Sequence, residues 1–302
     1  MDFGLCLPNF RAGASAEGID APAEAAERLG WSTVWTTDHL LIDRANAADY
    51  GRIYEAILTL AWVGARHPNV KLGTSVIVVP MRNAVVLAKE LATLDALTGG
   101  RVIAGLGIGW NEPEFANVGV AGRFHERGAY LEETINLFRH LWSGSTEPFH
   151  GRFHTFDDFA FEPLPDSRAK LPIVVGGGSA AALDRIGRLA DGYHSTAIGP
   201  TAYAERADVI RAAAKGAGRP EPTWSARVRV DLDGTSGSKR YALRGTPDEI
   251  AAEVQAWANT GVDHLALAFD ERDPARLTTL MDRFATEIVP RVRPASGRHL
   301  SA

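Results

Sequence analysis

Short apolar runs rich in β-branched residues alternate along the chain with longer segments in which apolar residues recur with a helical period. One such segment places Leu87, Leu91 and Leu94 on a single helical face, and Gly99 follows it as a stop signal. Alternation of this kind predicts a parallel sheet with helices packed outside it. The eight runs that we expect to form strands are Phe3–Leu7, Thr33–Thr37, Val70–Val79, Val102–Leu106, Ile173–Val175, Gly192–Thr196, Ser225–Val230 and His264–Ala268.

The number of strand–helix units favours a closed barrel over an open sheet. Dividing the 302 residues by eight gives about 38 residues per unit, and a strand–helix–strand crossover needs roughly 30 or more. We therefore predict an α/β fold, a (β/α)8 TIM barrel, as one domain over residues 1–290, followed by a C-terminal tail at 291–302. Residues 143–170, between the fourth and fifth strands, are rich in glycine, proline, aspartate and aromatic residues. We expect this insertion to form a small hairpin over one barrel end, as a lid or a subunit contact.

Charge and cysteine content narrow the class of partner. Lysine and arginine number 32 against 37 aspartates and glutamates, a net charge of −5, so nucleic acid and anionic membranes are poor partners and a small-molecule substrate is expected. The single cysteine, Cys6, excludes a disulfide framework and fits a small buried hydrophobe in a strand. We find no secretion signal and no apolar stretch long enough to cross a bilayer, so we expect a cytoplasmic protein.

Reactive side chains in such a barrel lie at the carboxyl ends of the strands. The second strand ends in Asp38 and His39, and a histidine there can give or take a proton near neutral pH. The alternative is a helix-capping aspartate beside a packed histidine. The third run carries Thr74 and Ser75 among apolar residues, and buried hydroxyls need partners, which local backbone could also supply.

Two glycine-rich strand ends are candidates for ligand contact. The fourth strand ends in Gly107-Ile108-Gly109-Trp110, where glycines allow a flat ligand to approach the backbone, although crowded barrel packing would also select them. The fifth strand runs through Gly176-Gly177-Gly178-Ser179 into a helix. Successive amides at a helix N-terminus favour phosphate binding over a plain tight turn. His194 ends the sixth strand at the same face.

Two other chemistries are excluded by residue type. None of the nine histidines forms the His-x-His pair of a metal-dependent hydrolase barrel, so we expect no metal site. The chain also lacks the Gly-x-Ser-x-Gly elbow of serine hydrolases.

In order and spacing, these motifs resemble those of the bacterial luciferase-like superfamily, most of all the branch that uses the deazaflavin coenzyme F420. The resemblance covers essentially the whole chain, from about Phe3 to Val289. It implies a (β/α)8 barrel that forms a homodimer, and a cis peptide at Ser75–Val76 behind the cofactor ring. The cofactor-binding residues that it implies are Asp38, Ser75, Val76, Gly107, Ile108, Gly109, Gly176, Gly177, Gly178 and Ser179.

The resemblance also implies a reaction: hydride transfer between the deazaflavin and a small organic substrate. His39 is then the general acid or base, with Trp110 and His194 on the substrate side. Trp110 stands where the sugar-phosphate dehydrogenases of this branch have a glutamate, and Ala197 follows the sixth strand in place of their lysine. An apolar or aromatic substrate is therefore expected. The alternatives are an FMN-dependent two-component monooxygenase and a barrel that binds a ligand without catalysis.

Overall fold

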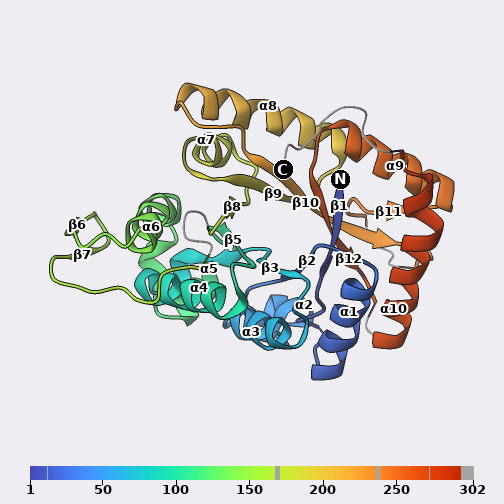
Figure 1. The fold of residues 1–302 in the computed structure, drawn as a ribbon, viewed down its shortest axis with the longest axis horizontal. Coiled ribbons are helices and arrows are strands. Elements are labelled where there is room, and N and C mark those ends of the chain that lie inside the picture. The colour runs from blue at the N-terminus through green and yellow to red at the C-terminus, as the bar shows by residue number, and fades with distance from the viewer. Residues whose placement is uncertain (12, 167–170, 236–238, 272, 294–302) are drawn as a thin grey trace.

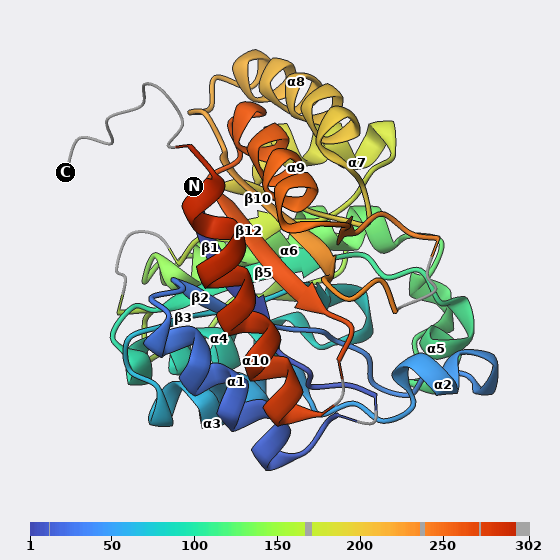
Figure 2. The ribbon, with the colours of Figure 1, turned by 90° about the vertical axis from the view of Figure 1, so that its right-hand side faces the viewer.

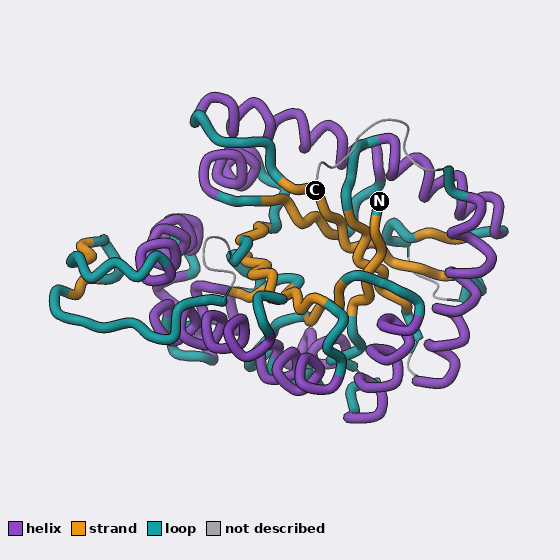
Figure 3. Tube along the Cα trace, in the orientation of Figure 1, coloured by secondary structure: helices purple, strands orange, loops and turns teal. Residues whose placement is uncertain are grey.

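Eight parallel strands close into a ring in the computed structural model, which describes residues 1–302 except 12, 167–170, 236–238, 272 and 294–302. Each strand pairs with the next along the chain, and pairing of the last strand with the first completes the barrel. Figure 3 shows the ring of strands inside a layer of helices. The predicted TIM barrel is therefore confirmed. Its strands are β1 (Asp2–Cys6), β2 (Thr33–Thr36), β3 (Lys71–Thr74), β5 (Val102–Gly107), β8 (Ile173–Val175), β9 (Gly192–Thr196), β10 (Thr223–Asp231) and β12 (His264–Phe269).

The helices begin and end at recognisable signals. Thr246 and Glu249 form a capping box at the start of α9 (Pro247–Asn259), and Gly99, at φ 68°, ends α4 (Ala84–Thr98). Figure 1 shows the helices surrounding the strands. The longer helices are α1 (Ala16–Arg28), α3 (Ala56–Arg66), α4 (Ala84–Thr98), α6 (Arg127–Trp142), α7 (Ala180–Leu189), α8 (Pro200–Gly216), α9 (Pro247–Asn259) and α10 (Pro274–Arg283). The short ones are η1 (Arg44–Asn46), α2 (Ala47–Tyr50), η2 (Val79–Met81), α5 (Glu112–Asn117), η3 (Ala121–Arg123), η4 (Phe284–Ile288) and η5 (Val289–Arg291).

The third strand differs from its prediction. The continuous run expected over Val70–Val79 is two strands, β3 and β4 (Ile77–Val78), and both pair with β5. Between them lies a cis peptide at Ser75–Val76, as the family resemblance implied. The prediction failed here because apolar residues continue across the break, whereas pairing with the neighbouring strands is interrupted between Thr74 and Ile77.

The insertion after α6 contains the predicted hairpin in a different place. Strands β6 (Phe149–His150) and β7 (Thr155–Phe156) pair antiparallel, and Figure 1 shows them beside α6, at the periphery of the molecule. Glu133 of α6 fixes the turn by accepting hydrogen bonds from the backbone amides of Arg152, Phe153 and His154. The expectation of a hairpin over a barrel end is therefore wrong. Residues 167–170 of the insertion and 294–302 of the predicted tail lie outside the described residues.

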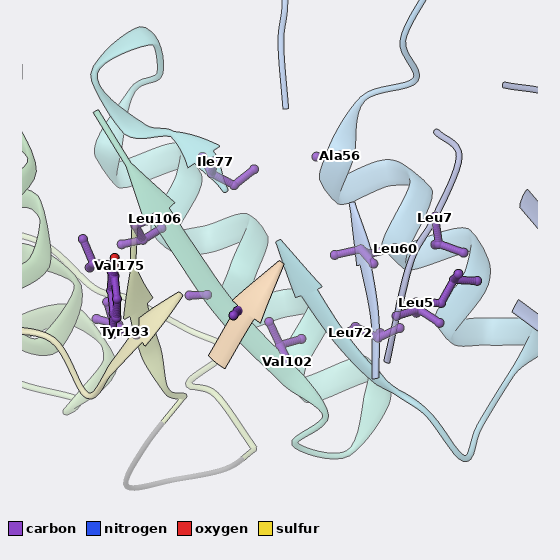
Figure 4. Close-up of a cluster of buried hydrophobic side chains, with 14 of the residues drawn as sticks. Leu5, Leu7, Ala56, Leu60, Leu72, Ile77, Val102, Leu106, Val175 and Tyr193 are labelled. Atoms are coloured by element: carbon purple, nitrogen blue, oxygen red, sulfur yellow. The ribbon is translucent and has the colours of Figure 1, made fainter. Parts of the chain in front are cut away.

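The core lies mainly between the strands and the helices. Figure 4 shows Leu5, Leu72 and Val102 of the strands near Leu60 of α3, and all four are fully buried. A smaller cluster includes Cys6, which is buried as predicted and whose pKa is raised by burial. One further strand, β11 (Leu243–Arg244), extends the sheet beside β10. Among the described residues, no helix has the length and apolar character needed to cross a membrane.

Candidate active site

The carboxyl ends of three strands meet around Val76. A Cβ added to Gly107 would lie 2.5 Å from Cγ2 of Val76, and one added to Gly176 would lie 3.6 Å from its Cγ1. Gly109 has a φ of 74°, and a Cβ there would lie 2.6 Å from Val78. The structure thus brings together predicted residues from β3–β4, β5 and β8. They form a closely packed floor, in which the side chains of Val76 and Val78 fill the space beside the glycines, and a flat ligand can lie against it.

His39 is held by a carboxylate from another segment. Its Nδ1 lies 2.7 Å from Oε2 of Glu114, and Oε1 of Glu114 accepts hydrogen bonds from the amides of Leu40 and Leu41 at 2.6 and 3.2 Å. Both side chains are buried. Because an ionised carboxylate only accepts hydrogen bonds, Nδ1 of His39 donates the proton and Nε2 is left to exchange one with a ligand.

Sequence analysis assigned no role to Glu114. It lies in the first turn of α5, where Asn111 caps the helix by accepting from its backbone amide at 2.8 Å. The sequence signal that could have found it is an acidic residue three positions after a helix-capping asparagine, Asn111, directly behind a glycine-rich strand end. Figure 2 shows α5 beside α2, at the end of the barrel toward which β10 and β12 point.

Aromatic rings line the space beside His39. The ring centroid of Tyr50 lies 4.3 Å from that of His39, and the centroid of Trp110 lies 5.9 Å away, edge-on. Phe10 stacks on Tyr50 at 5.7 Å. Trp110 is 55 % exposed, so its indole is available to a ligand. Sequence analysis found Trp110 and missed Tyr50, which ends the one-turn helix α2, and Phe10, which lies on the loop after β1. Neither segment has a periodic pattern that marks it.

Asp38 is buried behind the floor. Its Oδ2 accepts from the amide of Val78 at 2.8 Å, and its Oδ1 accepts from Nη2 of Arg82 at 2.6 Å. Arg82 also pairs with Glu55 at 2.8 Å. Both oxygens of Asp38 thus have protein partners and fix the backbone of β4. Its predicted contact with a cofactor ring stays a prediction.

His194 lies one layer below the barrel mouth. Nε2 lies 2.8 Å from Oγ of Ser75, and Nδ1 lies 2.8 Å from Oγ of Ser225. The ring also stacks on Trp35 at 4.4 Å. Burial lowers the pKa of His194 to about 3, with nearby positive charge adding to the effect, so the imidazole is neutral and supports Ser75. The structure places this residue, which was predicted to contact substrate, 2 % exposed and with both nitrogens engaged.

The turn before α7 has the donors that an anion needs. Gly177 has a φ of 150°, and a Cβ there would lie 2.7 Å from that of Ala182. The hydroxyl oxygen of Ser179 accepts from the amide of Ala182 at 3.3 Å, which leaves its hydrogen free to donate. A Cβ on Gly178 would lie 2.6 Å from Nη1 of Arg206, which donates to the Tyr193 hydroxyl at 3.4 Å. Amides at a helix N-terminus, a hydroxyl and a guanidinium together fit a phosphate group.

Arg206 was missed because it lies on α8, far along the chain from the glycines that it contacts. Only the packing of α8 against α7 brings its guanidinium to this turn. No local sequence pattern marks such a contact.

The sequence is similar to those of known proteins. The profile of a family described as luciferase-like monooxygenase matches residues 1–236. The F420-dependent glucose-6-phosphate dehydrogenase of Kineococcus radiotolerans is 30% identical, over 90% of this chain and 92% of that protein.

Two solved structures share the fold. One is the monooxygenase RslO1 from Streptomyces bottropensis, with a TM-score of 0.81 and 21% identity over 96% of this chain and 99% of that one. The other is an F420-dependent secondary alcohol dehydrogenase in complex with an F420–acetone adduct, with a TM-score of 0.81 and 19% identity over 97% and 99% of the two chains. At this level of identity the likeness is one of fold.

Proposed function

Since the chain belongs to the luciferase-like monooxygenase family, we propose that it is an F420-dependent oxidoreductase that transfers a hydride between the coenzyme and a small, largely apolar organic substrate. One arrangement carries the proposal. The floor at Val76 and Gly107 lies between the His39–Glu114 pair and the anion-binding turn before α7. A flat ring with a phosphate tail fits this arrangement.

The residues present fit coenzyme F420. Val76, Gly107 and Gly109 would hold the ring, while the turn at Gly177 and the guanidinium of Arg206 would hold the phosphate. The bound coenzyme supplies the carbon that gives or accepts the hydride, and the protein supplies position and charge.

His39 would move the proton that accompanies the hydride. Glu114 orients the imidazole of His39 by accepting the hydrogen bond from Nδ1, so Nε2 is the atom that gives or takes the proton. When Nε2 accepts a proton, the carboxylate of Glu114 stabilises the imidazolium that forms. The buried setting of the pair keeps its geometry fixed. The aromatic wall of Tyr50 and Trp110 favours an apolar substrate body beside this nitrogen.

We also propose that the protein forms a homodimer. Leu58 of α3 and Val86 and Leu97 of α4 are 72, 53 and 81 % exposed, and these two helices are in contact. Exposed large apolar side chains on adjacent helices are typical of a subunit interface. Light scattering on a sizing column tests this, and a purely monomeric protein would contradict it.

A thermal-shift panel with F420, FMN, FAD and NADPH tests the cofactor. A ligand that binds only the folded protein stabilises it by about 2.7 kcal/mol at a hundredfold excess over its Kd. We expect F420 to raise the Tm and the other three to leave it unchanged. A shift with FMN and none with F420 would favour the two-component monooxygenase, and no shift with any of the four would favour the ligand-binding barrel without catalysis.

A further inference from the structure

A small recess opens at the barrel mouth on the side away from the anion-binding turn. Its walls come from the loop after β1 and from the ends of β10 and β12, and include Leu7, Phe10, Arg227 and Phe269. In the ring of strands, β1 lies opposite β8, which leads into the turn at Gly177. The recess therefore belongs to a different part of the mouth from the cofactor's phosphate.

The recess is the size of one small polar group. Its volume is about 40 Å³, and a water-sized group needs roughly 10–15 Å³ by the same kind of measure. It can hold about three such groups, which matches the carbon and two oxygens of a carboxylate.

Arg227 gives this recess a positive charge that pairs with no acidic side chain among the described residues. Ser225, two residues earlier on β10, points into the barrel toward His194, so the side chain of Arg227 also points inward, one layer higher. Its Nη1 donates to Oγ1 of Thr37 at 2.9 Å and to the carbonyl of Ser75 at 3.3 Å. Both acceptors are neutral, and no ion pair joins Arg227 to a carboxylate in the described part of the chain.

The acidic residues at the rim are already paired. Asp270 accepts from Nη1 of Arg11 at 2.8 Å on one oxygen and from Nη2 of Arg229 at 2.6 Å on the other. Glu271 lies 2.9 Å from Nε of Arg276. The rim carboxylates are therefore neutralised by arginines, and they do not repel an anion that enters the recess. The guanidinium of Arg227, which bonds only to neutral acceptors among the described residues, attracts it.

We propose that this recess binds a carboxylate of the substrate, with Arg227 as its counter-charge. The substrate class is then an apolar carboxylic acid, whose body runs from the recess along Phe10 and Tyr50 toward His39. Phe10 links the two regions, since its ring lies 5.8 Å from the Arg227 guanidinium and stacks on Tyr50. Nε and Nη2 of Arg227 are the donors for a forked contact with the acid. The identity of the reacting substrate rests on the proposed function, whereas carboxylate binding itself does not.

The test compares acids with their amides by calorimetry, without any cofactor. The probes are benzoate, phenylacetate, 3-phenylpropanoate and hexanoate, each against its neutral amide. We expect at least one acid to bind the unaltered protein ten times more tightly than its amide, and Arg227→Gln to abolish that preference. Arg227→Lys, which keeps the charge and loses the fork, should retain part of it. Arg188→Gln is the matched control, because that arginine lies on α7, away from the recess, and pairs with Asp184, and it should keep the preference.

Several results would overturn this assignment. One is equal binding of acids and amides across the whole panel, and another is a preference that survives in a folded Arg227→Gln variant. A third is a loss of F420 affinity in Arg227→Gln as large as the loss of acid affinity, which would make Arg227 a cofactor contact. Failure of the unaltered protein to bind F420 while it still prefers acids would reject the proposed function and leave the recess assignment standing.

Discussion

Replacing Glu114 with glutamine tests whether this carboxylate holds His39 in the tautomer that proton transfer requires. The glutamate accepts from Nδ1 of His39 and from the amides of Leu40 and Leu41. A glutamine keeps the shape but removes the charge. If its oxygen keeps the two amides, its NH2 group faces Nδ1 of His39 and forces the histidine into the opposite tautomer.

The hydrogen bonds of Glu114 determine how much stability the substitution should remove. A hydrogen bond to a charged group contributes about 1.5–3 kcal/mol and a neutral one about 0.5–1.5 kcal/mol. We therefore expect Glu114→Gln to lose about 1–2 kcal/mol of unfolding free energy, or roughly 2–6 °C in Tm for a chain of this class. Turnover should fall more steeply, by about 10²–10⁴-fold, because the wrong tautomer removes general acid–base catalysis.

Melting curves and single-turnover hydride transfer, followed by the absorbance of the deazaflavin, measure both effects. Glu112→Gln is the matched control, since Glu112 is two residues away and its side chain is 59% exposed; its effect on stability should stay within about 0.5 kcal/mol. A double-mutant cycle with His39→Ala should show coupling of about 0.5–3 kcal/mol. The reasoning is refuted if the two glutamine variants melt alike and turn over alike.

Two further predictions follow from the site. Burial lowers the pKa of His194 to about 3 and that of His264 to about 4, so the unfolded chain binds more protons below about pH 6.5 and stability falls as the pH drops through that window. At about pH 5 each histidine should cost roughly 2 kcal/mol; urea unfolding checks this, and an unchanged pH dependence in His194→Gln would contradict it. In the anion-binding turn, Gly177→Ala forces a Cβ to within 2.7 Å of Ala182 and should weaken F420 binding by about tenfold or more, equal to 1.4 kcal/mol. Gly216→Ala, where a Cβ meets nothing within 4 Å, should not, and equal affinities in a fluorescence titration would count against the turn as the phosphate site.

The barrel was predictable because its signals are local. Apolar runs mark strands such as Ile173–Val175 and Gly192–Thr196, whose bounds match the structure residue for residue. The break in the third strand was not visible in that pattern, because hydrogen bonds from distant residues set it. The amide of Val78, for example, bonds to the carboxylate of Asp38, which follows β2.

The site was predictable at strand ends and not elsewhere. His39 and the glycines around Gly177 follow strands directly, so the rule that barrel chemistry lies at the carboxyl ends identifies them. Arg206 and Arg227 reach the mouth through tertiary packing, from an outer helix and from the inward face of a strand. Within the part of the chain that the structure describes, neither guanidinium forms an ion pair with a carboxylate, and such pairing is known only once the fold is known.

The most direct test of the account is a crystal structure of the protein grown with F420. We predict that the ring lies against Val76 and Gly107, with the phosphate at the turn before α7 and Nε2 of His39 beside the reacting face. An occupied site elsewhere, or an empty barrel mouth at saturating coenzyme, would contradict it.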